Sequence, residues 1–170
     1  MHNVPVICIV SKSRAGKTTV MENLIQELKK RAYRVAIIKH DAHSFEIDHP
    51  GKDTWRHYQA GADVVAISSA SKFALIERRE EEHALDDIIA SLPPVDLVLT
   101  EGFRRQNKPK IEVYRAEAHA TLLCEPHELL ALVSDTPWPI DVPQFALEDC
   151  DALADFVENY IKQYQEQAAQ

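Results

Sequence analysis

The sequence predicts a three-layer α/β fold with a mostly parallel central sheet. Short apolar runs rich in β-branched residues alternate along the chain with segments whose apolar side chains recur at helical spacing. The first run, residues 4–10, is almost uninterrupted, which is typical of a strand buried on both faces of a parallel sheet. In such a sheet, ligands bind at the carboxyl ends of the strands.

The remaining elements follow in order. Helices are expected from Lys17 to the basic cluster at 29–31, at residues 54–61, over an acidic-basic and then apolar stretch at 77–92, and along the C-terminal apolar stripe at 147–164. Further strands are expected at residues 34–39, 63–68, 72–77, 96–100, 110–115 and 129–134. The loops after residues 10, 39, 100 and 134 should share one crevice.

Length and charge limit the classes of function. The chain has 170 residues, which predicts a single domain over 1–170, and its net charge of −8 argues against broad binding to nucleic acid or to an anionic membrane. No N-terminal leader or membrane-spanning apolar run is evident, so a cytoplasmic protein is expected. The three widely spaced cysteines are expected to be reduced and buried.

A phosphate-binding loop follows the first strand. Gly16, Lys17 and Thr18 occupy the last three positions of the pattern G-x-x-x-x-G-K-[ST], whereas Ser11 replaces its first glycine. In this pattern backbone N–H groups surround the phosphates, the lysine neutralises them and the hydroxyl coordinates Mg²⁺. The preceding strand and following helix therefore predict a P-loop NTPase fold. The expected phosphate-binding residues are consecutive: Ser13, Arg14, Ala15, Gly16, Lys17, Thr18 and Thr19.

Carboxylates near this loop are candidate Mg²⁺ ligands. Glu101 follows a buried strand, and Asp41 and Asp48 lie in the polar loop after residues 34–39. Asp41 and Asp48 could equally cap a turn or a helix. The expected metal ligands are thus Thr18, Asp41, Asp48 and Glu101, and no residue is assigned a catalytic role.

The sequence offers one candidate site for recognition of the nucleotide's base. Ser134 and Asp135 follow the apolar strand at 129–134. A carboxylate there could accept hydrogen bonds from the N1 and exocyclic amino groups of guanine, a pair of donors that adenine lacks. A plain turn residue is the equally weighted alternative.

Two other classes of protein stay open. His40, His43, His49 and His57 could bind zinc or nickel, as in a metallochaperone GTPase. A small-molecule kinase could use the same phosphate loop with Arg104 and Arg105 as clamps, although the segment 78–87 is too acidic for an arginine-bearing lid.

Taken together, these motifs resemble the MobB family of molybdopterin-guanine dinucleotide biosynthesis adapters. The resemblance covers nearly the whole chain and rests on residues 16–19, 38–62, 72–76, 96–103, 110–115 and 131–137. It assigns Gly16 to Thr19 to the phosphate loop, and Glu101 with Gly102 to an acidic strand-end motif. His40, Asp48, Gly51, Lys52 and Asp53 match the family without a firm role for each. The sequence departs from the family pattern at Arg14, where a positive φ would cost about 1–2 kcal/mol.

The resemblance implies a GTP-binding adapter, dimeric and at most a weak GTPase, that uses Mg²⁺. Its implied partners are the guanylyltransferase that joins GMP to molybdopterin, a second copy of the chain, and molybdopterin itself. The residues alone leave the preference between GTP and ATP open.

Overall fold

The computed structural model describes residues 4–41 and 45–169, and the chain divides into two compact units. The first unit comprises Met1–His40 with Leu85–Gln170, and the second is Asp41–Ala84. One nucleotide-binding domain spanning residues 1–170 stays a prediction.

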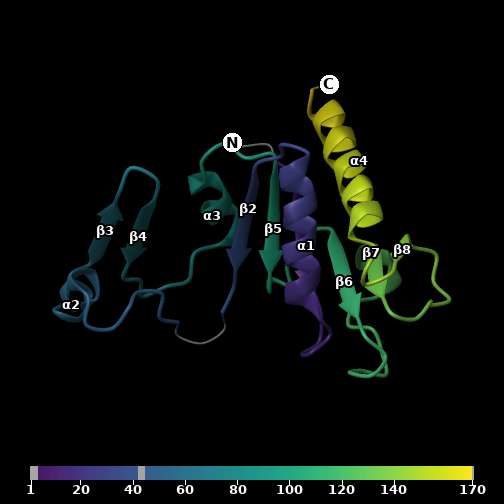
Figure 1. Cartoon of the computed structure of the whole chain (residues 1–170), viewed down its shortest axis with the longest axis horizontal. Helices are drawn as coiled ribbons and strands as arrows, with labels where there is room; N and C mark the ends of the chain where they lie inside the picture. The colour runs from purple at the N-terminus through teal and green to yellow at the C-terminus, as the bar shows by residue number, and fades with distance from the viewer. Residues whose placement is uncertain (1–3, 42–44, 170) are drawn as a thin grey trace. The chain divides into compact units, whose positions relative to one another are not determined.

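The first unit is built on a six-stranded sheet in which all neighbouring strands are parallel (Figure 1). The strands lie in the order β2-β5-β1-β6-β7-β8. Their bounds are β1 Val6–Val10, β2 Val35–Lys39, β5 Leu97–Glu101, β6 Lys110–Tyr114, β7 Leu129–Ser134 and β8 Gln144–Phe145. The parallel sheet is confirmed, while the two-residue β8 was not expected. The carboxyl ends of the strands lie at one edge of the sheet.

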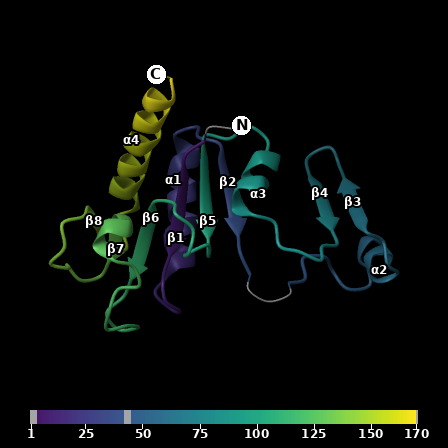
Figure 2. The same cartoon turned by 180° about the vertical axis from the view of Figure 1, so that it is seen from behind.

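Helices cover both faces of this sheet (Figures 1 and 2). On one face α1 (Lys17–Lys30) and α4 (Cys150–Ala168) form the larger core, in which Leu24, Leu28 and Ile161 are fully buried. On the other face the short α3 (Leu85–Ser91) packs through Leu85 and Ile89. A single 3₁₀ turn, η1 (Pro126–Glu128), precedes β7. The three-layer α/β architecture is confirmed.

Helix α1 ends in a turn that normally favours glycine. The amide of Ala32 donates to the Lys29 carbonyl at 3.0 Å, and the amide of Tyr33 donates to the Leu28 carbonyl at 3.1 Å. This is a Schellman motif, and Ala32 adopts the left-handed conformation that it requires, with φ of 65°. We expect Ala32→Gly to raise the free energy of unfolding by about 1 kcal/mol, because glycine removes the Cβ strain. Urea unfolding measures this change, and an unchanged or lower stability would contradict it.

Helix α3 begins at Leu85, so the prediction that it opens with the charged run at 77–82 is wrong. Glu77 instead ends a strand, and Arg79 Nη1 lies 3.0 Å from Glu77 Oε1. Arg78 donates to the Tyr58 carbonyl at 2.8 Å, and its guanidinium lies 4.3 Å from the centre of the Tyr58 ring. These contacts hold the arginines within the second unit.

The second unit contains a helix and a hairpin. The helix expected at 54–61 is present as α2 (Asp53–Gln59), and it ends just before Gly61, which has φ of 105°. The two apolar runs predicted at 63–68 and 72–77 are confirmed as strands β3 (Val64–Ser68) and β4 (Phe73–Glu77), and the structure adds that they pair antiparallel.

All three cysteines are free. Burial raises the pKa of Cys8, and it raises the pKa of Cys124 to about 12, so both thiols stay protonated at neutral pH. Cys150 is only partly buried. In the described part of the chain, no helix is long and apolar enough to cross a membrane.

Candidate functional site

The loop between β1 and α1 contains two residues in the left-handed conformation. Arg14 and Gly16 have positive φ values of 66° and 90°, and the side chain of Ala15 between them is buried. Amide groups in such turns, followed by a helix N-terminus, make a binding site for anions. Arg14 does adopt the positive φ considered from the sequence, and this left-handed conformation costs about 1–2 kcal/mol.

Lys17 and Glu101 form an ion pair across the edge of the sheet. Lys17 Nζ lies 3.0 Å from Glu101 Oε1, and both side chains are about four-fifths buried. Lys17 is the first residue of α1, and Glu101 is the last residue of β5, which pairs with β1. The two residues predicted to bind phosphate and metal therefore lie together, each neutralising the other.

Gly102 allows the chain to turn tightly after Glu101. It has φ of 96°, and a Cβ atom there would lie 2.9 Å from the Cβ of His40 and 3.2 Å from its carbonyl oxygen. The amide of His40 donates to the Glu101 carbonyl at 2.8 Å, and the His40 ring centre lies 5.0 Å from that of Phe103. The ends of β2 and β5 are thus held in close contact.

The other predicted metal ligands occupy different settings. Thr18 is exposed in the first turn of α1. Asp48 lies in the second unit, where its carboxylate accepts the amide of His49 at 2.8 Å; the Thr54 hydroxyl and this amide lower the pKa of Asp48. These contacts are those of a turn cap, the alternative raised for this residue. Asp41 is exposed, also in the second unit. For Asp41 and Asp48, metal binding stays a prediction.

The histidine-rich loop is only partly described. His43 lies outside the described residues. Among residues 4–41 and 45–169, no group of three or more His, Cys, Asp or Glu side chains is arranged to hold a metal ion. Arg104 and Arg105, the candidate clamps of a kinase, are exposed in the loop after β5.

Ser134 and Asp135 both form hydrogen bonds at the end of β7. The Ser134 hydroxyl donates to the carbonyl of Thr136 at 2.6 Å and accepts its amide at 3.0 Å. Both carboxylate oxygens of Asp135 lie within hydrogen-bonding distance of the Ala116 amide, at 2.9 and 3.3 Å. Asp135 is nevertheless exposed, and a carboxylate with one amide partner retains further acceptor positions.

Residues 115–121, which we call the strap, lie against the phosphate loop. His119 Nε2 donates to the Ser13 carbonyl at 2.6 Å, and Lys12 Nζ donates to the carbonyl and hydroxyl oxygens of Thr121, both at 2.7 Å. Leu123 and Cys124 follow the strap, and their amides donate to the buried carboxylate of Glu112 in β6 at 2.6 and 2.9 Å.

Sequence reasoning missed the strap, because the run 110–115 was read only as a strand. The rule that placed Glu101 and Asp135 at the site, the carboxyl end of a parallel strand, applies equally to Arg115 after β6. The arrangement as a whole can receive a phosphate group: it combines amides, a helix N-terminus and a lysine beside a carboxylate.

Comparison with known proteins identifies related chains. Residues 6–135 match the family described as molybdopterin guanine dinucleotide synthesis protein B, MobB. Molybdopterin-guanine dinucleotide biosynthesis adapter proteins of Haemophilus influenzae and Escherichia coli are each 33% identical to this chain; the alignments cover 96% and 94% of it, and 93% and 94% of those proteins.

Solved structures show the same relationship. A crystal structure of molybdopterin-guanine biosynthesis protein B superposes with a TM-score of 0.72 at 31% identity, covering 92% of this chain and 99% of that one. Bacillus subtilis MobB superposes with a TM-score of 0.71 at 25% identity, covering 91% of this chain and 96% of that one. The family match over residues 6–135 and these relatives show that this chain belongs to the MobB family.

Proposed function

We propose that this chain is a cytoplasmic, GTP-binding adapter that assists synthesis of the molybdopterin guanine dinucleotide form of the molybdenum cofactor. The observation that carries the proposal is the phosphate loop with Lys17 paired to Glu101 at 3.0 Å. A lysine at a helix N-terminus favours a ligand with several negative charges. The names of the related proteins supply the biosynthetic context.

Mg²⁺ accompanies the nucleotide in this proposal. The hydroxyl of Thr18 and the carboxylate of Glu101 are hard oxygen donors of the kind that Mg²⁺ prefers, so these residues would hold it. When bound, the ion would neutralise charge on the phosphates. Lys17 has a separate role, since it exchanges its carboxylate partner for phosphate oxygens when the nucleotide enters.

Asp135 is the proposed reader of guanine. It is exposed at the end of β7, and one backbone amide occupies only part of its acceptor capacity. GTP hydrolysis in this proposal is at most slow, as the resemblance to the MobB family implies. The adapter acts by presenting its nucleotide-bound surface to the guanylyltransferase.

A reconstituted assay tests this function. Purified guanylyltransferase, molybdopterin and GTP are incubated with the wild-type chain or with Lys17→Ala, and the guanine dinucleotide product is quantified. We expect wild-type protein to increase product formation and Lys17→Ala to lose the increase. Equal product with and without the wild-type chain would contradict the adapter role.

Glu101→Gln should reduce the dependence of GTP binding on Mg²⁺. Without Mg²⁺ the variant should bind GTP more tightly than wild type, because Lys17 is freed and a negative charge is removed from the phosphate site. With Mg²⁺ it should bind more weakly, because the ion loses a carboxylate ligand. Titrations with and without Mg²⁺ should show the ratio of the two affinities falling about tenfold or more.

Glu22→Gln is the matched control for this prediction. It removes the same charge from an exposed position of α1. We expect its Mg²⁺ dependence to equal that of wild type. An unchanged Mg²⁺ dependence in Glu101→Gln would show that this carboxylate is not a ligand.

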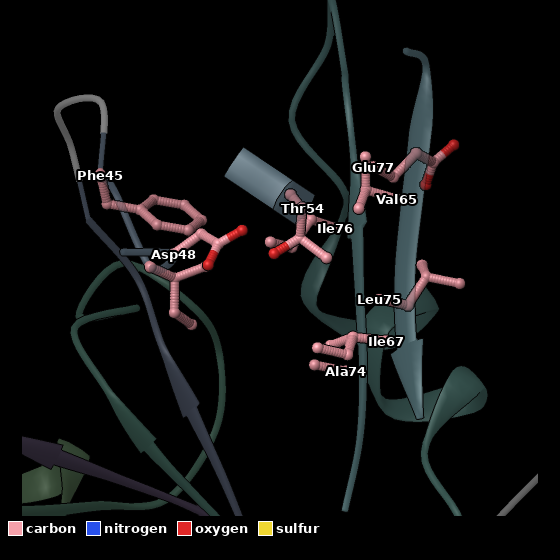
Figure 3. Close-up of a pocket in the computed structure, with 10 residues that line it drawn as sticks. Phe45, Asp48, Thr54, Val65, Ile67, Ala74, Leu75, Ile76 and Glu77 are labelled. Carbon is pink, nitrogen blue, oxygen red and sulfur yellow. The ribbon is translucent and has the colours of Figure 1, made fainter. Parts of the chain in front are cut away.

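A homodimer formed through the hairpin is part of the same proposal. Large apolar side chains are more than half exposed on and near β3 and β4: Phe45, Ile47, Val64, Ile67, Phe73 and Leu75. Several of them line an open cavity of about 360 Å³, in which Phe45 lies across from the hairpin (Figure 3). An isolated two-stranded sheet is only marginally stable and has two open edges. A second copy of the chain would cover this surface.

Phe73→Ser combined with Leu75→Ser should shift the dimer toward monomer. Both side chains are exposed on β4, so their loss removes apolar interface without opening a core. Sedimentation equilibrium measures the change, with Ile37→Ser, an exposed apolar residue of β2, as control. We expect a rise in the dimer dissociation constant of about tenfold or more. A monomeric wild type, or a double variant as dimeric as Ile37→Ser, would contradict this surface.

A further inference from the structure

The side chain of Arg115 lies against the phosphate loop. It directly follows β6, and its guanidinium nitrogen would lie 3.5 Å from a Cβ atom on Gly16, the residue that caps α1. Within residues 4–41 and 45–169, this guanidinium forms no hydrogen bond or ion pair. An arginine is therefore held at the mouth of the anion site with donors that a ligand can use.

The backbone of Arg115 is fixed on both sides. Its carbonyl accepts the amides of Ala118 and His119, both at 3.1 Å, and the next amide, of Ala116, is bound by Asp135 at 2.9 Å. His119 in turn donates to the carbonyl of Ser13 at 2.6 Å. The strap and the phosphate loop are thereby tied together, so hydrogen bonds on both sides hold the backbone of Arg115.

The charges around Arg115 and the phosphate loop favour binding of an anion. Lys17 is neutralised by Glu101, but no carboxylate of the described residues pairs with Arg115, which lies beside the positive end of α1. A cation in this place is electrostatically unfavourable in the free protein. It becomes favourable once a negatively charged group binds to the loop.

We propose that Arg115 is a second cationic ligand of the nucleotide's phosphate chain, acting beside Lys17. This inference rests on the proposed function of the phosphate loop. The planar guanidinium can donate two parallel hydrogen bonds to phosphate oxygens, which the ammonium of Lys17 does not do. In this arrangement the strap has a positioning role, because Asp135 and His119 hold Arg115 where the phosphates arrive.

Calorimetric titration with GTP and GMP in Mg²⁺ tests the proposal. Arg115→Gln should weaken GTP binding about ten- to a hundredfold and GMP binding much less, because GMP lacks the outer phosphates. Arg115→Lys should recover part of the loss. Lys30→Gln, which removes one exposed positive charge at the far end of α1, should bind GTP within about twofold of wild type. The unfolding temperature of nucleotide-free Arg115→Gln should equal that of wild type.

The outcomes of these titrations distinguish failure of the Arg115 proposal from failure of the proposed GTP-binding function on which it rests. If wild type binds GTP and Lys17→Ala does not, but Arg115→Gln binds as wild type does, Arg115 is not a ligand. A loss equal for GTP and GMP, with a lowered unfolding temperature, would assign Arg115 a structural role and overturn the proposal. Absence of GTP binding by wild type would overturn the proposed function, and this inference with it.

Discussion

Replacing Lys17 by alanine should weaken GTP binding by about a hundredfold or more. The ammonium lies at the first position of α1, four-fifths buried, where it would meet the phosphates of the nucleotide. A charged hydrogen bond contributes about 1.5–3 kcal/mol, and one ammonium can donate to more than one phosphate oxygen. Glu101 would hold Mg²⁺ in the bound state, so the lost contacts between Lys17 and the phosphates dominate the change. Calorimetry measures this loss of affinity.

A matched variant separates this local effect from the overall charge. Lys30→Ala removes the same charge from the last turn of α1, where the side chain is largely exposed. Its GTP affinity should stay within about twofold of wild type, because screening weakens interactions between such distant charges. If Lys17→Ala bound GTP as well as Lys30→Ala does, the phosphate loop would not be the nucleotide site.

Gly102→Ala should lower the free energy of unfolding by about 2–4 kcal/mol. The backbone at Gly102 has φ of 96°, and the new methyl group would lie 2.9 Å from the Cβ of His40. Neither atom belongs to a flexible side-chain end, so β2 and β5 would have to separate at their carboxyl ends. Urea unfolding of nucleotide-free protein measures the loss.

Gly16→Ala is the control for backbone strain alone. Gly16 has φ of 90°, but the nearest other atom to its Cβ position is 3.5 Å away, at the end of the Arg115 side chain. We expect Gly16→Ala to lose about 1–2 kcal/mol and Gly102→Ala to lose clearly more. Equal losses would show that the contact with His40 does not constrain the strand ends.

Local patterns were sufficient for much of the fold and part of the site. The buried strand, the loop and the helical spacing after Lys17 predicted β1, the phosphate loop and α1, because each depends on neighbours in sequence. The strand-end rule predicted that Glu101 would lie beside that loop. The structure adds that Glu101 pairs with Lys17, a contact that depends on β5 being the neighbour of β1.

Other features depend on contacts that the sequence does not display. The charged run at 77–82 looked like the start of a helix, but Arg78 and Arg79 bind Tyr58 and Glu77 instead. The strap over the phosphate loop depends on hydrogen bonds between residues more than a hundred positions apart, such as His119 with Ser13. The division into two units likewise depends on which residues contact one another within each unit, and periodicity carries no information about that.

Titration of the purified wild-type chain with GTP and with ATP, in the presence of Mg²⁺, decides whether this chain is a guanine-nucleotide-binding protein. We expect binding of one GTP per chain and clearly weaker binding of ATP, with Asp135 exposed to receive the base and Lys17 to receive the phosphates. A titration in which GTP produces no saturable binding would contradict the proposal that this chain binds guanine nucleotides.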